Sequence, residues 1–324
     1  MNRRSLKLSL AGLLFSTAVA RADVTLLLEE PFGTFGAMNP TGHAAIYLSR
    51  ICADSPLSLR RCNQGELGVV ISRYHRIAGF DWIAIPVIPY LYAVDQADQV
   101  PKSVGEKDEA ALRDEYRRRY LEELAPDALD GSAPEGEWIQ LVGAAYDRTI
   151  YAFGIESTEE QDDAFIKLFN SRPNSTHFNL FFFNCADFSR KAMDTYYPHA
   201  VHRSVLADAG IMTPKQAGRS LLSYTKHHKD LQFSILVIPQ VEGTVPRSTA
   251  VRGVLEALVK SKRYAVPLVT VAVLHPFVGG SLAFAWIEGS RFDPRKMVPP
   301  DNTTSIPAAI EVELQSNRAA PSAQ

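Results

Sequence analysis

The residue with the clearest chemical potential is Cys185, which stands where an apolar run ends in the segment FNLFFFNCADF of residues 178–188. The pattern predicts a buried strand that stops at Asn184 and a helix that begins at Cys185. The positive end of a helix dipole favours a thiolate, and a thiolate is a nucleophile. The alternative is an inert buried thiol, which behaves as a small hydrophobic side chain.

A thiol nucleophile requires a base within hydrogen-bond reach and a polar group that orients this base. His43 is the histidine best placed for this role, because it follows Gly42 and opens an apolar strand over residues 43–49. A histidine at such a position can also be purely structural. The remaining histidines, cysteines and acidic residues show no spacing typical of a zinc site, so we expect neither a metal nor another cofactor.

The N-terminus has the pattern of a secretory signal peptide over residues 1–22. Basic residues precede an apolar run over residues 8–19, and Ala20-Arg21-Ala22 fits a cleavage site. An uncleaved anchor is the alternative, and both place the next domain outside the cytoplasm. In that oxidising environment Cys52 and Cys62, ten residues apart, are the natural disulfide pair, which leaves Cys185 as the free thiol.

A second long apolar segment follows near the C-terminus. Residues 264–287 contain no Asp, Glu, Lys or Arg, and basic residues flank both ends. A helix of this length spans a bilayer, so we predict one transmembrane helix with Trp286 at an interface. A buried core helix or a re-entrant segment is the alternative, because His275-Pro276 and Gly279-Gly280 interrupt the pattern.

These segments divide the chain into an exported enzyme-like domain with flanking parts. We expect a domain over residues 23–241, a linker and amphipathic helix over 242–263, the transmembrane helix over 264–287 and a disordered cytoplasmic tail over 288–324. The net charge of −2 provides no basic face, so nucleic acid is not an expected partner. Short strands before and after a charged helix at residues 106–124 indicate an α+β fold.

Two of these segments together carry a resemblance. Gly42-His43-x-x-Ile46-Tyr47-Leu48, followed far downstream by Asn184-Cys185-x-x-Phe188, resembles the circularly permuted papain-like thiol enzymes. This superfamily includes NlpC-type cell-wall peptidases, lecithin:retinol acyltransferase-like enzymes and the periplasmic domain of a bacterial lipoprotein N-acyltransferase. The resemblance covers two short motifs within residues 23–241. It implies an antiparallel sheet with helices packed on it and a histidine that precedes the cysteine.

The resemblance also implies roles for individual residues. Cys185 would be the nucleophile and His43 the base. The third polar residue of the family falls on Ser72, a departure from the usual His or Glu, with Glu66 and His75 as alternatives. Asn184 would support the oxyanion or act only as a turn residue.

The implied activity is that of a thioester-forming hydrolase or acyltransferase, anchored in the inner membrane of a bacterial envelope with its catalytic domain in the periplasm. A membrane lipid or lipoprotein is the favoured substrate, and the aromatic run at residues 181–183 could accommodate acyl chains or could simply be core. A peptidoglycan amide peptidase that acts on cell-wall peptides is the alternative enzyme. A non-enzymatic envelope scaffold is the third hypothesis.

Overall fold

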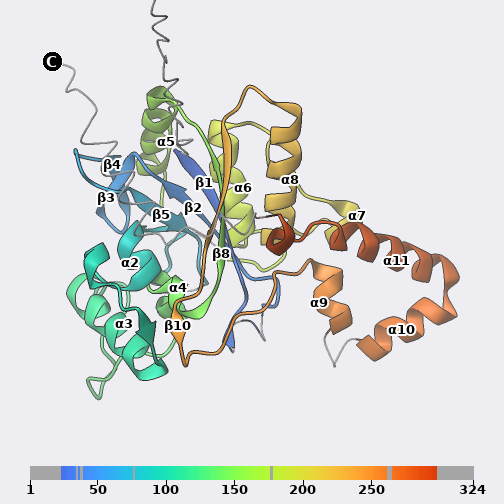
Figure 1. Cartoon of the computed structure of the whole chain (residues 1–324), viewed down its shortest axis with the longest axis horizontal. Helices are drawn as coiled ribbons and strands as arrows, with labels where there is room; N and C mark the ends of the chain where they lie inside the picture. The colour runs from blue at the N-terminus through green and yellow to red at the C-terminus, as the bar shows by residue number, and fades with distance from the viewer. Residues whose placement is uncertain are drawn as a thin grey trace, which may run out of the picture.

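The fold is built on one six-stranded antiparallel sheet (Figure 1). The computed structural model describes residues 23–297, apart from residues 34–35, 37–38, 76, 176–177 and 261–264. The strand order is β6-β5-β2-β1-β8-β9. The strands are β1 (Val24–Glu29), β2 (His43–Leu48), β5 (Val69–Ser72), β6 (Ile83–Pro86), β8 (Ile150–Ile155) and β9 (Phe233–Ile238). The predicted α+β class and antiparallel sheet agree with this arrangement.

Helices cover both faces of the sheet, which explains why its central strands are apolar at nearly every position. On one face, Leu27, Ala45 and Val70 pack beneath α2 (Val87–Tyr92), α3 (Glu106–Tyr120) and α4 (Ala144–Asp147). On the other face, Leu26 and Ile46 pack beneath α5 (Glu159–Ser171), α6 (Cys185–Tyr196) and α8 (Pro214–His227). Neighbouring residues of a strand, such as Leu26 and Leu27, face opposite sides of the sheet because side chains alternate with a period of two.

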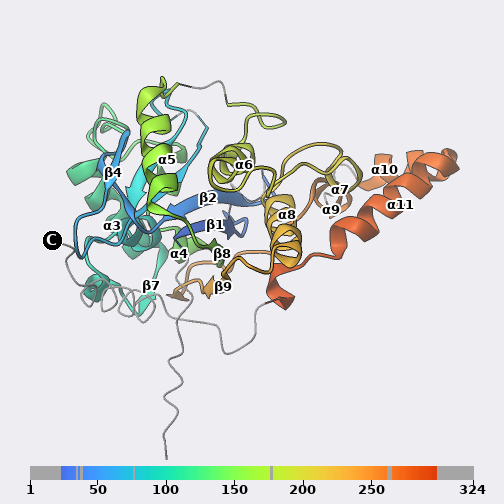
Figure 2. The same cartoon turned by 90° about the horizontal axis from the view of Figure 1, so that it is seen from above.

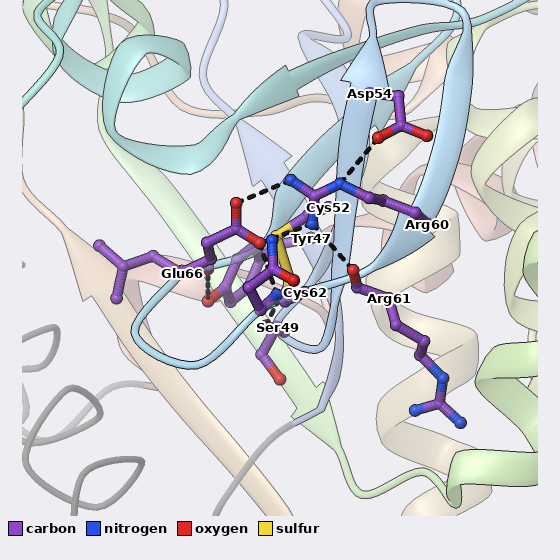
Figure 3. Close-up of a disulfide and its surroundings, with 10 residues drawn as sticks. Tyr47, Ser49, Cys52, Asp54, Arg60, Arg61, Cys62 and Glu66 are labelled. Atoms are coloured by element: carbon purple, nitrogen blue, oxygen red, sulfur yellow. Dashed lines mark hydrogen bonds and ion pairs between the residues drawn. A yellow bond between two sulfur atoms is a disulfide. The ribbon is translucent and has the colours of Figure 1, made fainter.

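The excursion between β2 and β5 is a small hairpin, β3 (Ile51–Ser55) and β4 (Ser58–Arg61), closed by the Cys52–Cys62 disulfide (Figure 3). The strand β5 begins at Val69, three residues after Glu66. Gly68 lies before it with φ of 83°, and a Cβ at Gly68 would sit 2.2 Å from the Leu48 carbonyl oxygen. This turn therefore separates Glu66, one of the alternative third residues, from the strand that carries Ser72.

The predicted buried strand before Cys185 is wrong. Residues 180–183 form a turn with a single bridge between Asn179 and Phe183, and Leu180, Phe181, Phe182 and Phe183 are each about half exposed. The Asn179 side chain accepts hydrogen bonds from the backbone N–H groups of Phe181 and Phe182, which closes the turn. Local side-chain bonding of this kind competes with strand formation and overrides the apolar pattern here.

The predicted transmembrane helix is also wrong. No helix within the described residues is both long and apolar enough to cross a bilayer. The segment folds instead as two packed helices, α10 (Ala265–Leu274) and α11 (Pro276–Ser290) (Figure 2). Pro276 has no N–H and restricts the residue before it, so the first helix ends there and a second begins. Gly279 permits close packing at the corner, since a Cβ there would lie 2.4 Å from the Ala272 carbonyl oxygen.

The remaining short elements connect these layers. They are η1 (Ala97–Gln99), β7 (Ser103–Val104), η2 (Glu137–Leu141), α7 (Val205–Asp208), β10 (Glu242–Gly243), α9 (Val254–Lys260) and η3 (Pro294–Lys296).

Both predicted terminal segments lie largely outside the described residues: the whole signal peptide over residues 1–22, and residues 298–324 of the tail. Residues 288–297 are described and are not a free tail. Phe292 is buried against the sheet core, and Arg295 pairs with Glu30 at 2.7 Å.

Candidate active site

Cys185 is the first residue of α6, as the sequence predicts. Asn184 caps this helix: its side-chain oxygen accepts a hydrogen bond from the Asp187 backbone N–H at 2.9 Å. Both amide hydrogens are also used, since Nδ2 donates to the carbonyl oxygens of Leu180 and Met212 at 2.9 Å each. Asn184 therefore positions the turn and the helix start, and it has no donor left for an oxyanion.

His43 opens β2 and is held by Ser72 from the neighbouring strand β5. The distance from Ser72 Oγ to His43 Nε2 is 2.8 Å, and Ser72 Oγ also donates to the Ala44 carbonyl oxygen at 2.8 Å. Because the hydroxyl has only one proton, it accepts from Nε2 while it donates to Ala44. This arrangement protonates Nε2 and leaves Nδ1 with the free lone pair that a base needs. The Tyr74 ring stacks on the imidazole at 5.0 Å between centroids and fixes its plane.

The thiol and the imidazole line the same pocket, which has a volume of about 370 Å³. The Ala44 backbone N–H, adjacent to His43 in the chain, is close enough to lower the pKa of the Cys185 thiol. The thiol of Cys185 and the imidazole of His43, which lie far apart in the sequence, thus line one cavity. Its other lining residues are Pro31, Phe32, Gly36, Asn39, Gly42, Arg73, Tyr74, His75, Glu137, Gln140, Arg148, Phe178 and Leu180.

Burial sets the protonation of both groups. It raises the pKa of the Cys185 thiol to about 11, against the lowering effect of the Ala44, Ala186 and Cys185 backbone N–H groups. Burial also holds the pKa of His43 well below its usual value, and the positive charge of Arg148 lowers it further. The resting pair is therefore a neutral thiol and a neutral imidazole. The expectation that the helix start favours a ready thiolate is wrong, because the loss of solvation outweighs the helix N–H groups.

A buried ion pair that the sequence analysis missed lies beside this pair. Glu29, at the end of β1, binds Arg148 at 2.9 Å and accepts a hydrogen bond from the Tyr90 hydroxyl. Burial raises the pKa of Glu29 although Arg148 opposes this. Arg148 is 1% exposed, and among the described residues its Nε and Nη2 atoms have no hydrogen-bond partner. A charged residue at the end of an otherwise apolar strand was the available sequence signal for Glu29.

Gln140 is another pocket residue that the sequence analysis did not identify. It belongs to η2, and its side chain makes no hydrogen bond to any residue in the described part of the chain. Its amide hydrogens are therefore available to a bound molecule. No local sequence motif distinguishes this glutamine.

The structure separates the alternatives for the third residue. Ser72 contacts His43, whereas Glu66 lies by the disulfide, where both of its oxygens bind Arg60 at 2.6 and 2.7 Å (Figure 3). Arg60 is the main cause of the low pKa of Glu66, about 2. His75 does line the pocket, but its Nδ1 faces Glu137 Oε1 at 3.5 Å and its ring lies against Phe178.

One group of side chains has ligand atoms at the distances that a metal ion would need. Within the described ranges, the one cluster with suitable ligand distances is Cys52, Cys62 and Glu66. Its two sulfur atoms are joined in the disulfide and its carboxylate binds Arg60, so none of the three is free to bind an ion.

Comparisons of the chain with protein-family models, with curated proteins and with solved structures found no match.

Proposed function

We propose that this protein is a cysteine-dependent acyl hydrolase or acyltransferase. His43 Nδ1 takes the proton from the Cys185 thiol as sulfur attacks the carbonyl carbon of an ester or amide. The carbon–oxygen or carbon–nitrogen bond breaks, and the leaving group takes the proton from His43. A thioester on Cys185 remains. Water or an amine then attacks it, His43 accepts the proton of this second nucleophile, and the thiol is restored.

The observation that carries this proposal is the Ser72–His43–Cys185 arrangement. A serine hydroxyl fixes one nitrogen of a buried imidazole, and the other nitrogen is free in a pocket that also holds the one free thiol among the chain's three cysteines. Ser72 is a positioning residue and cannot stabilise an imidazolium as a carboxylate does. The neutral resting pair requires proton transfer during attack, so His43 acts as a true general base.

The surroundings of Cys185 support an apolar acyl group as the substrate. Four half-exposed apolar side chains, those of Leu180 to Phe183, directly precede the nucleophile helix, and Phe178 and Leu180 line the pocket. The disulfide supports action in an oxidising compartment outside the cytoplasm. A lipid or lipoprotein ester fits both features.

One observation favours the second candidate, an amide peptidase acting on cell-wall peptides. Two buried arginines, Arg73 and Arg148, line the pocket. Guanidinium groups suit a peptide carboxylate, although they also suit a phosphate.

Trapping the acyl-enzyme tests the proposal. The purified full chain would be incubated with p-nitrophenyl esters of increasing acyl length and with N-acyl dipeptides, and its intact mass measured after a rapid quench. We expect a mass increase equal to the acyl group, which neutral hydroxylamine removes as it cleaves thioesters. Cys185→Ala should show no increase, and His43→Ala should show slow acylation.

The outcome also separates the hypotheses. Acylation by esters with long chains supports the lipid candidate, and acylation only by N-acyl dipeptides supports the peptidase. A chain whose mass stays unchanged with every substrate, or changes equally in Cys185→Ala, would contradict an enzymatic role and leave the scaffold hypothesis.

A further inference from the structure

The C-terminal helical hairpin α10–α11 projects from the body of the protein and exposes apolar side chains over its surface (Figures 1 and 2). Phe277, at its tip, is 94% exposed, and Val273 is 72% exposed. The other large exposed apolar residues of the hairpin are Val266, Val269, Val271, Leu274, Val278, Phe284 and Ile287. Such a surface is much larger than the scattered apolar residues of an ordinary protein exterior.

The apolar residues surround both helices instead of forming a stripe. No charged residue occurs between Ala265 and Ile287. A helix that docks on a protein partner is apolar on one face and polar on the other, whereas a helix that is apolar all round is typical of a fully apolar environment. Lipid surrounds an inserted hairpin on all sides, so this pattern favours lipid over a protein partner.

The helices of the hairpin are too short to cross a bilayer. α10 has 10 residues and α11 has 15. At about 1.5 Å per residue these lengths are about 15 and 22 Å, against a hydrocarbon layer of about 30 Å. Neither helix reaches across the layer: α10 covers about half of its thickness and α11 about three quarters.

The base of the hairpin is polar and fixed to the body, as an interface with lipid headgroups requires. Glu288 of α11 pairs with Arg219 of α8 at 3.0 Å and also with Arg291. Glu256 of α9 pairs with Lys215 of α8 at 2.7 Å. The charged pairs thus lie on the side where the hairpin meets the protein, while its tip is apolar apart from the exposed His275.

The apolar surface also extends toward the thiol. Val205 and Leu206 of α7 are exposed and line, with Phe277 and Phe284 of α11, a groove of about 780 Å³. Arg203, two residues before Val205, binds the Phe182 carbonyl oxygen at 3.3 Å in the aromatic turn that precedes Cys185. The groove therefore ends two residues from an arginine that contacts the turn before Cys185.

We propose that the α10–α11 hairpin inserts into one leaflet of a phospholipid bilayer and holds the Cys185 pocket at the lipid surface. The insertion itself is independent of the proposed enzymatic activity. Its consequence, that the acyl donor is a membrane lipid or a lipid-modified protein, rests on that activity. Delivery of an acyl chain would then follow the exposed residues of α7 and the turn at residues 180–183.

Trp286 provides a direct test, because it lies in α11 and is partly exposed, whereas Trp82 and Trp138 are buried in the body. The full chain would be mixed with phosphatidylethanolamine–phosphatidylglycerol vesicles whose acyl chains carry bromine, a quencher of tryptophan fluorescence. We expect quenching of Trp286 and its disappearance in Trp286→Phe. The apolar residues 8–19 could bind vesicles on their own, so the readout is the depth of Trp286 and not binding alone.

The double variant Val273→Asp with Phe277→Asp should reduce the quenching at least tenfold, because both positions are exposed and both charges would enter hydrocarbon. Leu129→Asp is the matched control: Leu129 is fully exposed on a loop remote in sequence from the hairpin, and its variant should be quenched like the original chain. Circular dichroism would verify that the three chains are equally folded.

Unquenched Trp286 in the original chain, or equal quenching in the Val273/Phe277 variant, would overturn the proposal. A concentration-dependent dimer that the double variant abolishes, seen by light scattering without quenching by vesicles, would also overturn it and assign the surface to a second copy of the chain. Acylation of Cys185 by a water-soluble ester should be unchanged in the double variant, so a failure of insertion is distinguishable from a failure of the enzymatic proposal.

Discussion

At the scale of single residues, the site combines three ionisable groups whose burial disfavours their charged forms. The thiol, the imidazole and the Glu29 carboxyl each shift toward the neutral form, with burial as the largest cause. Arg148 keeps its positive charge among them, since its pKa is raised by Glu29 and nearby tyrosines despite burial. An environment of this kind strengthens the electrostatic effect of each proton that moves during a reaction.

The pH dependence of alkylation should reveal the neutral thiol. Because the pKa of Cys185 is about 11, against 9.0 for an ordinary thiol, its thiolate fraction near pH 8 is about one hundredth of that of a model peptide. We expect the rate with iodoacetamide, followed by intact mass, to rise up to pH 11. Cys52 and Cys62 are joined, so Cys185 is the only thiol that reacts. A plateau below pH 8 would instead indicate a thiolate–imidazolium pair.

Loss of the Ser72 hydroxyl should slow acylation without weakening substrate binding. Ser72→Ala removes the bond that protonates His43 Nε2 and orients its ring. A neutral hydrogen bond contributes about 0.5–1.5 kcal/mol, so we expect kcat for the ester substrates to fall about two- to twelvefold, with KM unchanged. Ser72→Thr keeps the hydroxyl and should restore part of the rate. An unchanged kcat in Ser72→Ala would mean that Tyr74 stacking alone positions the imidazole.

At the scale of elements, the start of α6 is the part on which the site depends most. Asn184 joins three segments, since its side chain bonds the turn at Leu180, the loop at Met212 and the helix at Asp187. It thereby fixes Cys185 against β2. The aromatic turn and the nucleophile helix are oriented by this one amide.

Asn184→Ala should therefore destabilise the fold. Loss of a helix cap costs about 1 kcal/mol, and two carbonyl oxygens lose their donor, so we expect the free energy of unfolding to fall by about 2–4 kcal/mol in urea denaturation. Asn184→Asp keeps the oxygen that caps the helix but cannot donate to the two carbonyl groups. Its free energy of unfolding should therefore lie between those of the original chain and Asn184→Ala. Full stability combined with loss of acylation would contradict this structural role and restore the oxyanion role.

The sequence predicted those elements whose local pattern and tertiary environment agree. His43 opens β2 and Cys185 opens α6, and the charged helix expected at residues 106–124 is α3. The predictions for residues 178–183 and 264–287 were wrong, because they relied on apolar composition alone. The first run was expected to be a buried strand and the second a membrane span. In the first, the Asn179 side chain closes a turn, and in the second Pro276 ends a helix. Apolar content does not encode where a chain reverses.

The same limit applies to the site. His43 and Cys185, which were identified from motif order, line one pocket, and Ser72 contacts His43 from the neighbouring strand. Glu29 and Arg148 were missed because they are 119 residues apart in sequence and become partners only through the β1–β8 pairing. A pairing across strands has no local signature.

At the scale of the whole molecule, ion pairs connect segments distant in the chain. Arg50 pairs with Asp23 and with Asp162, each at 2.7 Å, and Arg295 binds Glu30 across 265 residues. These contacts join both ends of the described chain to the central sheet. Protonation changes at buried groups should therefore be felt as changes in global stability.

Acid titration of His43 should be one such change. The pKa of His43 lies well below 6.5 in the folded protein because of burial first and Arg148 second. As the pH falls below about 6.5 the unfolded chain takes up this proton first, so stability is lost from there down to the folded pKa. A difference of one bound proton between the folded and unfolded chains changes the free energy of unfolding by at most about 1.4 kcal/mol per pH unit.

The measurement compares the free energy of unfolding in urea between pH 7 and pH 5. His43→Gln removes the titrating group, so its stability should fall less steeply than that of the original chain, by up to one proton. His227→Gln is the control for the substitution itself, because His227 is exposed at the end of α8. The other buried carboxyls, Glu29 included, are common to all three chains. If the free energy of unfolding depends equally on pH in the His43 variant and the original chain, the imidazole is solvated. The pocket around Cys185 would then be open to water.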